Sequence, residues 1–135
     1  MMRYCTRFRL LLTLMLACVS SDAMAEWTYY GSNKDSDLYM DYESIRKDSE
    51  IAKMRFMEDY RGVKKISFGR SFLSATTLGE YDCKEERVRT LSFAIHSERM
   101  GNGDVVFTSK MKMDWEAIVP DSLGEILWKK ACGKK

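Results

Sequence analysis

Polar and apolar residues alternate through much of the chain, which is the pattern of β-strands that bury one face of a sheet. The two clearest stretches are residues 51–60 and 87–96. In the first stretch, one face carries Ala52, Met54 and Phe56, and the other carries Lys53, Arg55 and Met57. In the second, strict alternation groups Arg87, Arg89, Leu91, Phe93 and Ile95 on one face. Both stretches predict strands of an antiparallel sheet.

Turn-forming residues connect further predicted strands to these two. Residues 27–30 and 37–41 are expected to pair as a hairpin across a polar turn. Residues 42–46 are expected to form a bend or a short turn of helix. The segment Gly101-Asn102-Gly103 predicts a tight turn after residues 87–96, because Asn-Gly accepts the positive φ angles that hairpins need. Residues 105–109 would then return antiparallel.

The middle of the chain has a less regular pattern. Residues 61–65 are expected to be a basic loop, and residues 74–78 a strand that leads to Cys83. Between them, the large apolar residues are expected to be buried: Phe68, Phe72 and Leu73.

The end of the chain predicts one α-helix. Ser122 and Glu125 have the spacing of a capping box, and Gly133 is placed to end the helix. Between them, Leu123, Ile126, Leu127 and Ala131 recur at helical spacing. The whole pattern predicts an α+β domain, in which a single antiparallel sheet of about six strands carries a C-terminal helix packed on it.

A targeting segment is predicted ahead of this domain. Arginines at positions 3, 7 and 9 precede the apolar residues 10–17, and Ala23-Met24-Ala25 supplies the small residues that signal peptidase accepts. Residues 1–25 are therefore expected to be a signal peptide and residues 26–135 the exported domain, with no transmembrane span after cleavage. A second processing route is lipidation at Cys18, because residues 14–18 loosely resemble a lipoprotein signal.

Removal of the leader changes the charge balance. The full chain has 22 Lys and Arg and 20 Asp and Glu, and the loss of three arginines and Asp22 leaves 19 of each. A net charge of zero argues against generic nucleic-acid binding.

Two of the four cysteines, Cys83 and Cys132, lie in the exported part of the chain. Disulfides persist in the oxidising compartments outside the cytoplasm, so these two are expected to pair. A metal site and two free thiols are the alternatives. With a single histidine and no second cysteine nearby, neither a metal nor a cofactor is predicted.

No catalytic set can be assembled from the sequence. His96 is the single histidine and no nucleophile motif accompanies it, so an enzyme is not predicted. The acidic residues near the start of the domain lack the spacing of a calcium loop: Asp35, Asp37, Asp41 and Glu43. Basic residues with aromatic neighbours could form a ligand-binding surface in the middle of the chain, but an ordinary charged sheet face is the favoured interpretation because nearby acidic residues nearly cancel their charge: Lys64, Lys65, Arg70, Lys84, Arg87 and Arg89.

A set of landmarks resembles a known family. Tyr81-Asp82-Cys83 is followed by Arg87-Val88-Arg89, by residues 100–103 and by Trp115 with Ile118-Val119-Pro120. The pattern continues with Trp27, residues 38–41, Asp59-Tyr60 and the segment from Trp128 to Cys132. Together they resemble the surface-adhesin protein E-like domain of bacterial exported proteins.

The resemblance implies a fold, a location and a class of partner. It implies an antiparallel sheet joined by a cysteine pair to a C-terminal helix, and display at the bacterial surface. The adhesin that named the family binds host extracellular-matrix proteins such as vitronectin and laminin. By the same resemblance, such binding would fall on Arg70, Lys84, Arg87 and Arg89.

We therefore expect an exported, non-enzymatic, adhesin-like binding module in the periplasm or on the outer-membrane surface. Its partner would be a host matrix protein, and it could also form a homodimer. The alternative is a periplasmic structural protein that binds another component of the envelope, because a fold does not fix a function.

Overall fold

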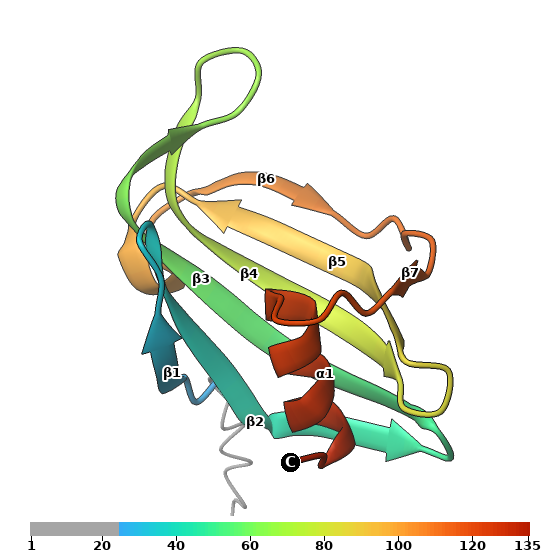
Figure 1. The fold of residues 1–135 in the computed structure, drawn as a ribbon. Coiled ribbons are helices and arrows are strands. Elements are labelled where there is room, and N and C mark those ends of the chain that lie inside the picture. Colours follow the sequence, from blue (N-terminus) through green and yellow to red (C-terminus); the bar gives the residue numbers. More distant parts are fainter. Residues whose placement is uncertain (1–24) are drawn as a thin grey trace, which may run out of the picture.

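Six strands of one antiparallel sheet follow each other in chain order, and a helix lies across one face of the sheet (Figure 1). The computed structural model describes residues 25–135. The strands are β1 (Thr28–Ser32), β2 (Ser36–Asp48), β3 (Ile51–Lys65), β4 (Ser71–Asp82), β5 (Arg87–His96) and β6 (Val105–Ser109). A two-residue strand, β7 (Glu116–Ala117), also pairs with β5. The predicted α+β architecture is confirmed.

The C-terminal helix, α1 (Leu123–Cys132), begins and ends at the predicted residues. The Ser122 side chain accepts a hydrogen bond from the Glu125 N–H, which satisfies one of the free donors at the helix start. The Glu125 carboxylate accepts from the Asp121 N–H, one residue earlier than the predicted capping box. Gly133 adopts a left-handed conformation with φ of 68°, which ends the helix.

The main core lies between α1 and the face of the sheet that it covers. Ala52 and Met54 of β3 point into this layer and are fully buried, as the alternation of β3 predicts. From the helix and the neighbouring strands, the core receives Leu38, Met40, Tyr81, Leu127, Trp128 and Ala131. Burial of these apolar groups holds the helix against the sheet.

A short 3-10 helix, η1 (Arg99–Gly101), covers part of the opposite face. Met57 lies three residues after Met54 in a regularly paired part of β3, so it points to this second face, where it is also fully buried. Asp59, on the same face, accepts hydrogen bonds from the Arg99 side chain and from the Met100 N–H. These contacts hold η1 against the sheet.

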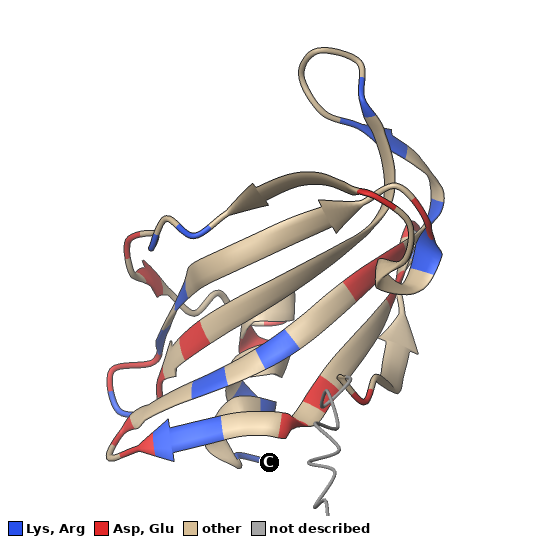
Figure 2. Ribbon diagram, turned by 180° about the vertical axis from the view of Figure 1, so that it is seen from behind, with Lys and Arg blue, Asp and Glu red and all other residues tan. Residues whose placement is uncertain are grey.

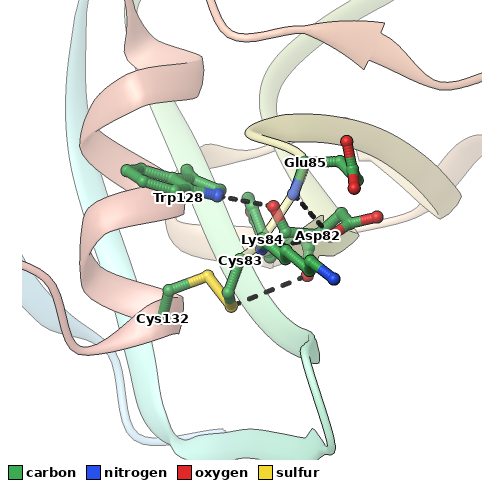
Figure 3. The surroundings of a disulfide bond; sticks show 7 residues. Asp82, Cys83, Lys84, Glu85, Trp128 and Cys132 are labelled. Atoms are coloured by element: carbon green, nitrogen blue, oxygen red, sulfur yellow. Dashed lines mark hydrogen bonds between the residues drawn. A yellow bond between two sulfur atoms is a disulfide. The ribbon is translucent and has the colours of Figure 1, made fainter.

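The predicted disulfide is present between Cys83 and Cys132, with an S–S distance of 2.04 Å. Figure 3 shows that it joins the residue after β4 to the last residue of α1. Beside it, the Trp128 indole N–H donates to the Asp82 carbonyl at 2.8 Å. The crosslink and this hydrogen bond therefore fix the end of the helix to the same corner of the sheet.

Several strands are longer than the sequence predicts, among them β2, β3 and β4. Residues 42–46 belong to β2, with an irregularity in its pairing between Asp41 and Arg46 in place of a helical turn. There the Ser44 hydroxyl donates to the Asp41 carbonyl and accepts from the Arg55 N–H, so strand pairing resumes after the bend. Residues 61–65, expected to be a loop, continue β3, with Lys64 and Lys65 paired to the start of β4.

Two local expectations are wrong. Phe68 is 99% exposed, because it lies at the tip of the β3–β4 connection, beyond the sheet. In the β5–β6 connection, Asn102 has φ of −95°. The positive φ angles are taken there by Met100, Gly101 and Gly103.

The predicted signal peptide and the lipidation site at Cys18 lie outside the described residues. Within residues 25–135, no helix is long and apolar enough to cross a membrane.

Candidate ligand-binding face

The sheet face opposite α1 carries a group of exposed cations. Figure 2 views the molecule from behind and shows where basic and acidic residues fall along the strands. Strand register places Arg46 opposite Lys53, Lys53 opposite Glu80, and Glu80 opposite Arg89 in one row across β2, β3, β4 and β5. We call the following cations on this side the basic face: Arg46, Lys53, Arg55, Arg89 and Lys110. All are exposed except Arg89, whose side chain is 19% exposed.

A β-bulge puts Arg89 on this face. Thr90 and Ser92 oppose consecutive residues of β4, so Leu91 is an extra residue in β5. Arg87 and Arg89 therefore point to the same side as Ser92, and not to the side of Phe93 and Ile95 as strict alternation predicts. That prediction is wrong because one unpaired residue reverses the two faces of a strand.

The two hollows of this face adjoin each other along the strands. One is lined by residues of β2, β3, β4 and β5 and by Trp115: Arg46, Lys47, Asp48, Ile51, Lys53, Glu80, Arg89 and Trp115. The other is lined by residues of β3, β4, β5 and β6 and the segment after β6, among them Arg55, Leu78, Ser92, Thr108 and Lys110. Apolar and hydroxyl groups thus lie between the cations.

Burial decides which charges a ligand meets here. The Glu80 side chain is only 7% exposed, whereas that of Lys53 is 49% exposed. Glu80 accepts two hydrogen bonds from the Arg89 guanidinium and lies 3.8 Å from the Lys53 ammonium. The Glu80 carboxylate lies beneath Lys53, and Asp48 is an exposed carboxylate at the β2 end of the face. The exposed charge is therefore positive overall, most clearly around Arg55 and Lys110.

Trp115 fixes the orientation of two arginines. The Arg89 guanidinium carbon lies 4.1 Å from the centre of the indole ring and that of Arg87 lies 4.8 Å from it. Stacking on the ring and pairing with Glu80 hold the Arg89 guanidinium in one position. A planar cation fixed in this way can bind a carboxylate or another oxyanion with little loss of side-chain entropy.

Arg87 is held by Asp82 at the edge of the face. Its Nε donates to Asp82 at 3.0 Å, and the other oxygen of Asp82 accepts from the N–H groups of Glu85 and Lys84. The Glu85 N–H, and then Arg87, hold the pKa of the Asp82 carboxyl below its ordinary value despite its burial. Asp82 therefore stays ionised and anchors the β4–β5 turn.

Two cations that line one hollow remain free to receive a ligand. Arg55 and Lys110 are exposed, and neither forms an ion pair with any residue between 25 and 135. They line the same hollow from opposite sides. Ligand anions at this position would meet two unneutralised positive charges. Arg46 also forms no ion pair among the described residues, but its guanidinium donates to the carbonyls of Glu43 and Ile45.

The structure brings together only part of the predicted binding set. Arg87 and Arg89 share the rim of the basic face, and Lys84 lies nearby in the β4–β5 turn. Arg70 immediately precedes β4, whereas Lys84 follows its end, so the 12-residue strand separates them by about 40 Å. Arg70 is therefore not part of the basic face.

The sequence does not predict that the following residues belong to one surface: Arg46, Lys53, Arg55, Lys110 and Trp115. The alternation in residues 51–60 already placed Lys53 and Arg55 on the face away from the core. Arg46 was assigned to a bend, and nothing local relates Lys110 or Trp115 to β3.

The other candidate chemistry does not assemble into a site. His96 is hydrogen-bonded to Thr76 at 3.0 Å, and its partial burial lowers its pKa. Among residues 25–135, no three His, Cys, Asp or Glu side chains are grouped to hold a metal ion.

Comparisons with known proteins agree with this fold. None of the curated proteins matches the sequence significantly. Among solved structures, the selenomethionine form of Haemophilus influenzae protein E is 17% identical with a TM-score of 0.60, over 78% of this chain and 85% of that one. Crystal form II of the same protein is 16% identical with a TM-score of 0.61, over 83% and 91% of the two chains.

A third structure, of protein E from non-typeable Haemophilus influenzae, is 17% identical with a TM-score of 0.53 and covers 82% of this chain and 76% of that one. At these identities the likeness is one of fold. The sequence itself matches the surface-adhesin protein E family from residue 27 to residue 133, which is nearly all of the described chain. The chain therefore belongs to the surface-adhesin protein E family.

Proposed function

We propose that this protein is an exported, non-enzymatic adhesin-like module that holds an acidic surface of a protein ligand on the basic face. The observation that carries the proposal is the unequal burial of charge on that face. Glu80 is covered, while Lys53, Arg55 and Lys110 are exposed. Such a surface attracts acidic partners and speeds their association.

Membership of the family supports the adhesin-like part of the proposal. The identity of the ligand is proposed beyond that. The partners that we propose are host matrix proteins such as vitronectin and laminin. This protein would bind them while displayed on the outer-membrane surface. Arg87, Arg89 and Lys84 would contribute at the rim of the basic face, and Arg70 would contribute only to a ligand that also reaches the β3–β4 connection. Self-association as a homodimer stays a prediction.

Surface proteolysis and ligand binding test this function together. Intact cells that express the full chain would be treated with protease. The amounts of this protein released from the cells and remaining on them would then be measured. The purified exported protein would be passed over immobilised vitronectin and laminin. We expect cleavage on intact cells and salt-sensitive binding to at least one of the two matrix proteins.

Protection from protease until the outer membrane is disrupted, together with no binding to either protein, would contradict the adhesin function. Co-purification with a component of the envelope under those conditions would support the alternative, a periplasmic envelope-binding protein. The same basic face would then be tested against that component.

A further inference from the structure

The β3–β4 hairpin extends as a finger beyond the rest of the sheet. Figures 1 and 2 both show the connection projecting away from the end of the sheet that carries the C-terminus. The pairing of Lys64 with Phe72 and of Lys65 with Ser71 continues the ladder into it, and the Ile66 N–H bonds to the Arg70 carbonyl. We call residues 63–70 the finger.

A large apolar side chain stands at the tip of the finger. Phe68 is 99% exposed, and its φ of 77° is in the left-handed region that favours glycine. The Gly69 N–H bonds to the Ile66 carbonyl, so Phe68 takes the third position of a β-turn, where a positive φ calls for glycine. A phenyl ring in a strained and solvated position contributes nothing to the stability of the fold.

All charged side chains around this ring are positive. No Asp or Glu occurs between Arg61 and Gly79, whereas acidic and basic residues balance over the exported domain as a whole. Lys65 and Arg70 flank the tip on its two strands and are exposed. An anionic surface would therefore meet no repulsion along the whole finger.

Aromatic side chains pack at the base of the finger. The rings of Tyr60 and Phe72 pack edge to face with their centres 5.7 Å apart. The Lys64 ammonium lies 5.5 Å from the centre of the Tyr60 ring. These contacts hold the two strands together at the base of the finger.

We propose that the finger docks on an anionic lipid bilayer, with Phe68 inserted among the headgroups and acyl chain ends, and Lys65 and Arg70 against headgroup phosphates. Aromatic rings favour the membrane interface, and basic residues beside them add electrostatic attraction to anionic lipids. A bilayer presents negative charge on every side of an inserted ring and needs no shaped pocket. This contact goes beyond the proposed ligand binding, because it uses neither Arg55 nor any other member of the basic face.

Co-sedimentation with lipid vesicles tests the finger. The purified exported protein would be mixed with vesicles of phosphatidylcholine alone and with vesicles that contain about one-third phosphatidylglycerol. We expect binding to the anionic vesicles that falls roughly tenfold in Phe68→Gly, since burial of a phenyl ring accounts for about that factor. Lys65→Gln combined with Arg70→Gln should give a similar loss, and Phe68→Trp should retain binding.

The controls separate this contact from folding and from the basic face. Phe68→Gly is expected to keep or raise the Tm, because glycine adopts the required φ without strain. Val119→Ala removes another exposed apolar side chain and Arg55→Gln a cation of the basic face, and both should bind vesicles as the parent protein does. Equal binding of Phe68→Gly and parent protein to anionic vesicles, equal binding to the two vesicle types, or no binding to either would overturn the proposal.

Discussion

At the scale of single residues, the position of Tyr81 depends on a neighbour with no side chain. The ring of Tyr81 is almost fully buried and lies back over Gly79 in the same strand. A Cβ atom at position 79 would lie 2.7 Å from Cζ of the ring and would also clash with the hydroxyl. Burial raises the pKa of the Tyr81 hydroxyl above its ordinary value, so it stays protonated.

The substitution Gly79→Ala is expected to lower the free energy of unfolding by about 1–3 kcal/mol, because the ring must shift within a packed core. Gly62→Ala is the matched control, since no atom lies within 4 Å of the added Cβ. Urea denaturation of both variants gives the comparison. In a Tyr81→Phe background the loss should be smaller, because the clashing hydroxyl is absent. Equal stability of the two alanine variants would mean that the Tyr81 ring does not pack closely against Gly79.

At the scale of elements, α1 depends on the disulfide at its last residue. Cys83 follows β4, and Cys132 ends the helix, so the crosslink spans 49 positions of the sequence. A loop of that size restricts the unfolded chain strongly in the chain-entropy account of disulfides. The apolar layer between helix and sheet supplies the remaining attachment.

We expect Cys83→Ser and Cys132→Ser to reduce the free energy of unfolding by similar amounts, about 2–5 kcal/mol, because each removes the same crosslink. The double variant should cost no more than either single one, and reduction of the parent protein should match them. Denaturation with and without reductant measures the free energy of unfolding of the two single variants, the double variant and the parent protein. A difference of several kcal/mol between the two single variants would show that one cysteine has a role outside the pair.

Most of the helix and strand boundaries that could be predicted from the sequence depend on residues close to them in the chain. Ser122 and Gly133 define the helix ends by local backbone chemistry, and the two glycines at positions 101 and 103 mark the turn before β6. The bulge at Leu91 could not be predicted, because an extra residue is visible only once β5 is aligned with β4. The faces of Arg87 and Arg89 were therefore assigned wrongly, although the strand itself was correct.

At the scale of the whole molecule, the two faces of the sheet have different roles. One face carries the helix and the core, and much of the other face stays open between η1 and Trp115. The cations of that open face come from four strands or connections far apart in the sequence. For this reason the candidate site could be predicted only in part: Arg89 was expected as a binding residue, and the alternation in residues 51–60 placed Lys53 and Arg55 away from the core.

The most direct test of the account removes the two cations of the basic face that line the hollow between β3 and the segment after β6. Arg55→Gln combined with Lys110→Gln leaves the ion pairs of Glu80 and Asp82 intact. The control is Lys34→Gln combined with Lys135→Gln, which removes the same charge away from that face. Affinity for immobilised vitronectin and laminin would be measured at low and at physiological salt.

The account predicts that the first variant binds roughly ten times more weakly than the parent protein, with a smaller dependence on salt, while the control stays within about twofold. Equal losses in the two variants would show a response to net charge alone. Unchanged binding in the first variant would contradict the basic face as the binding surface.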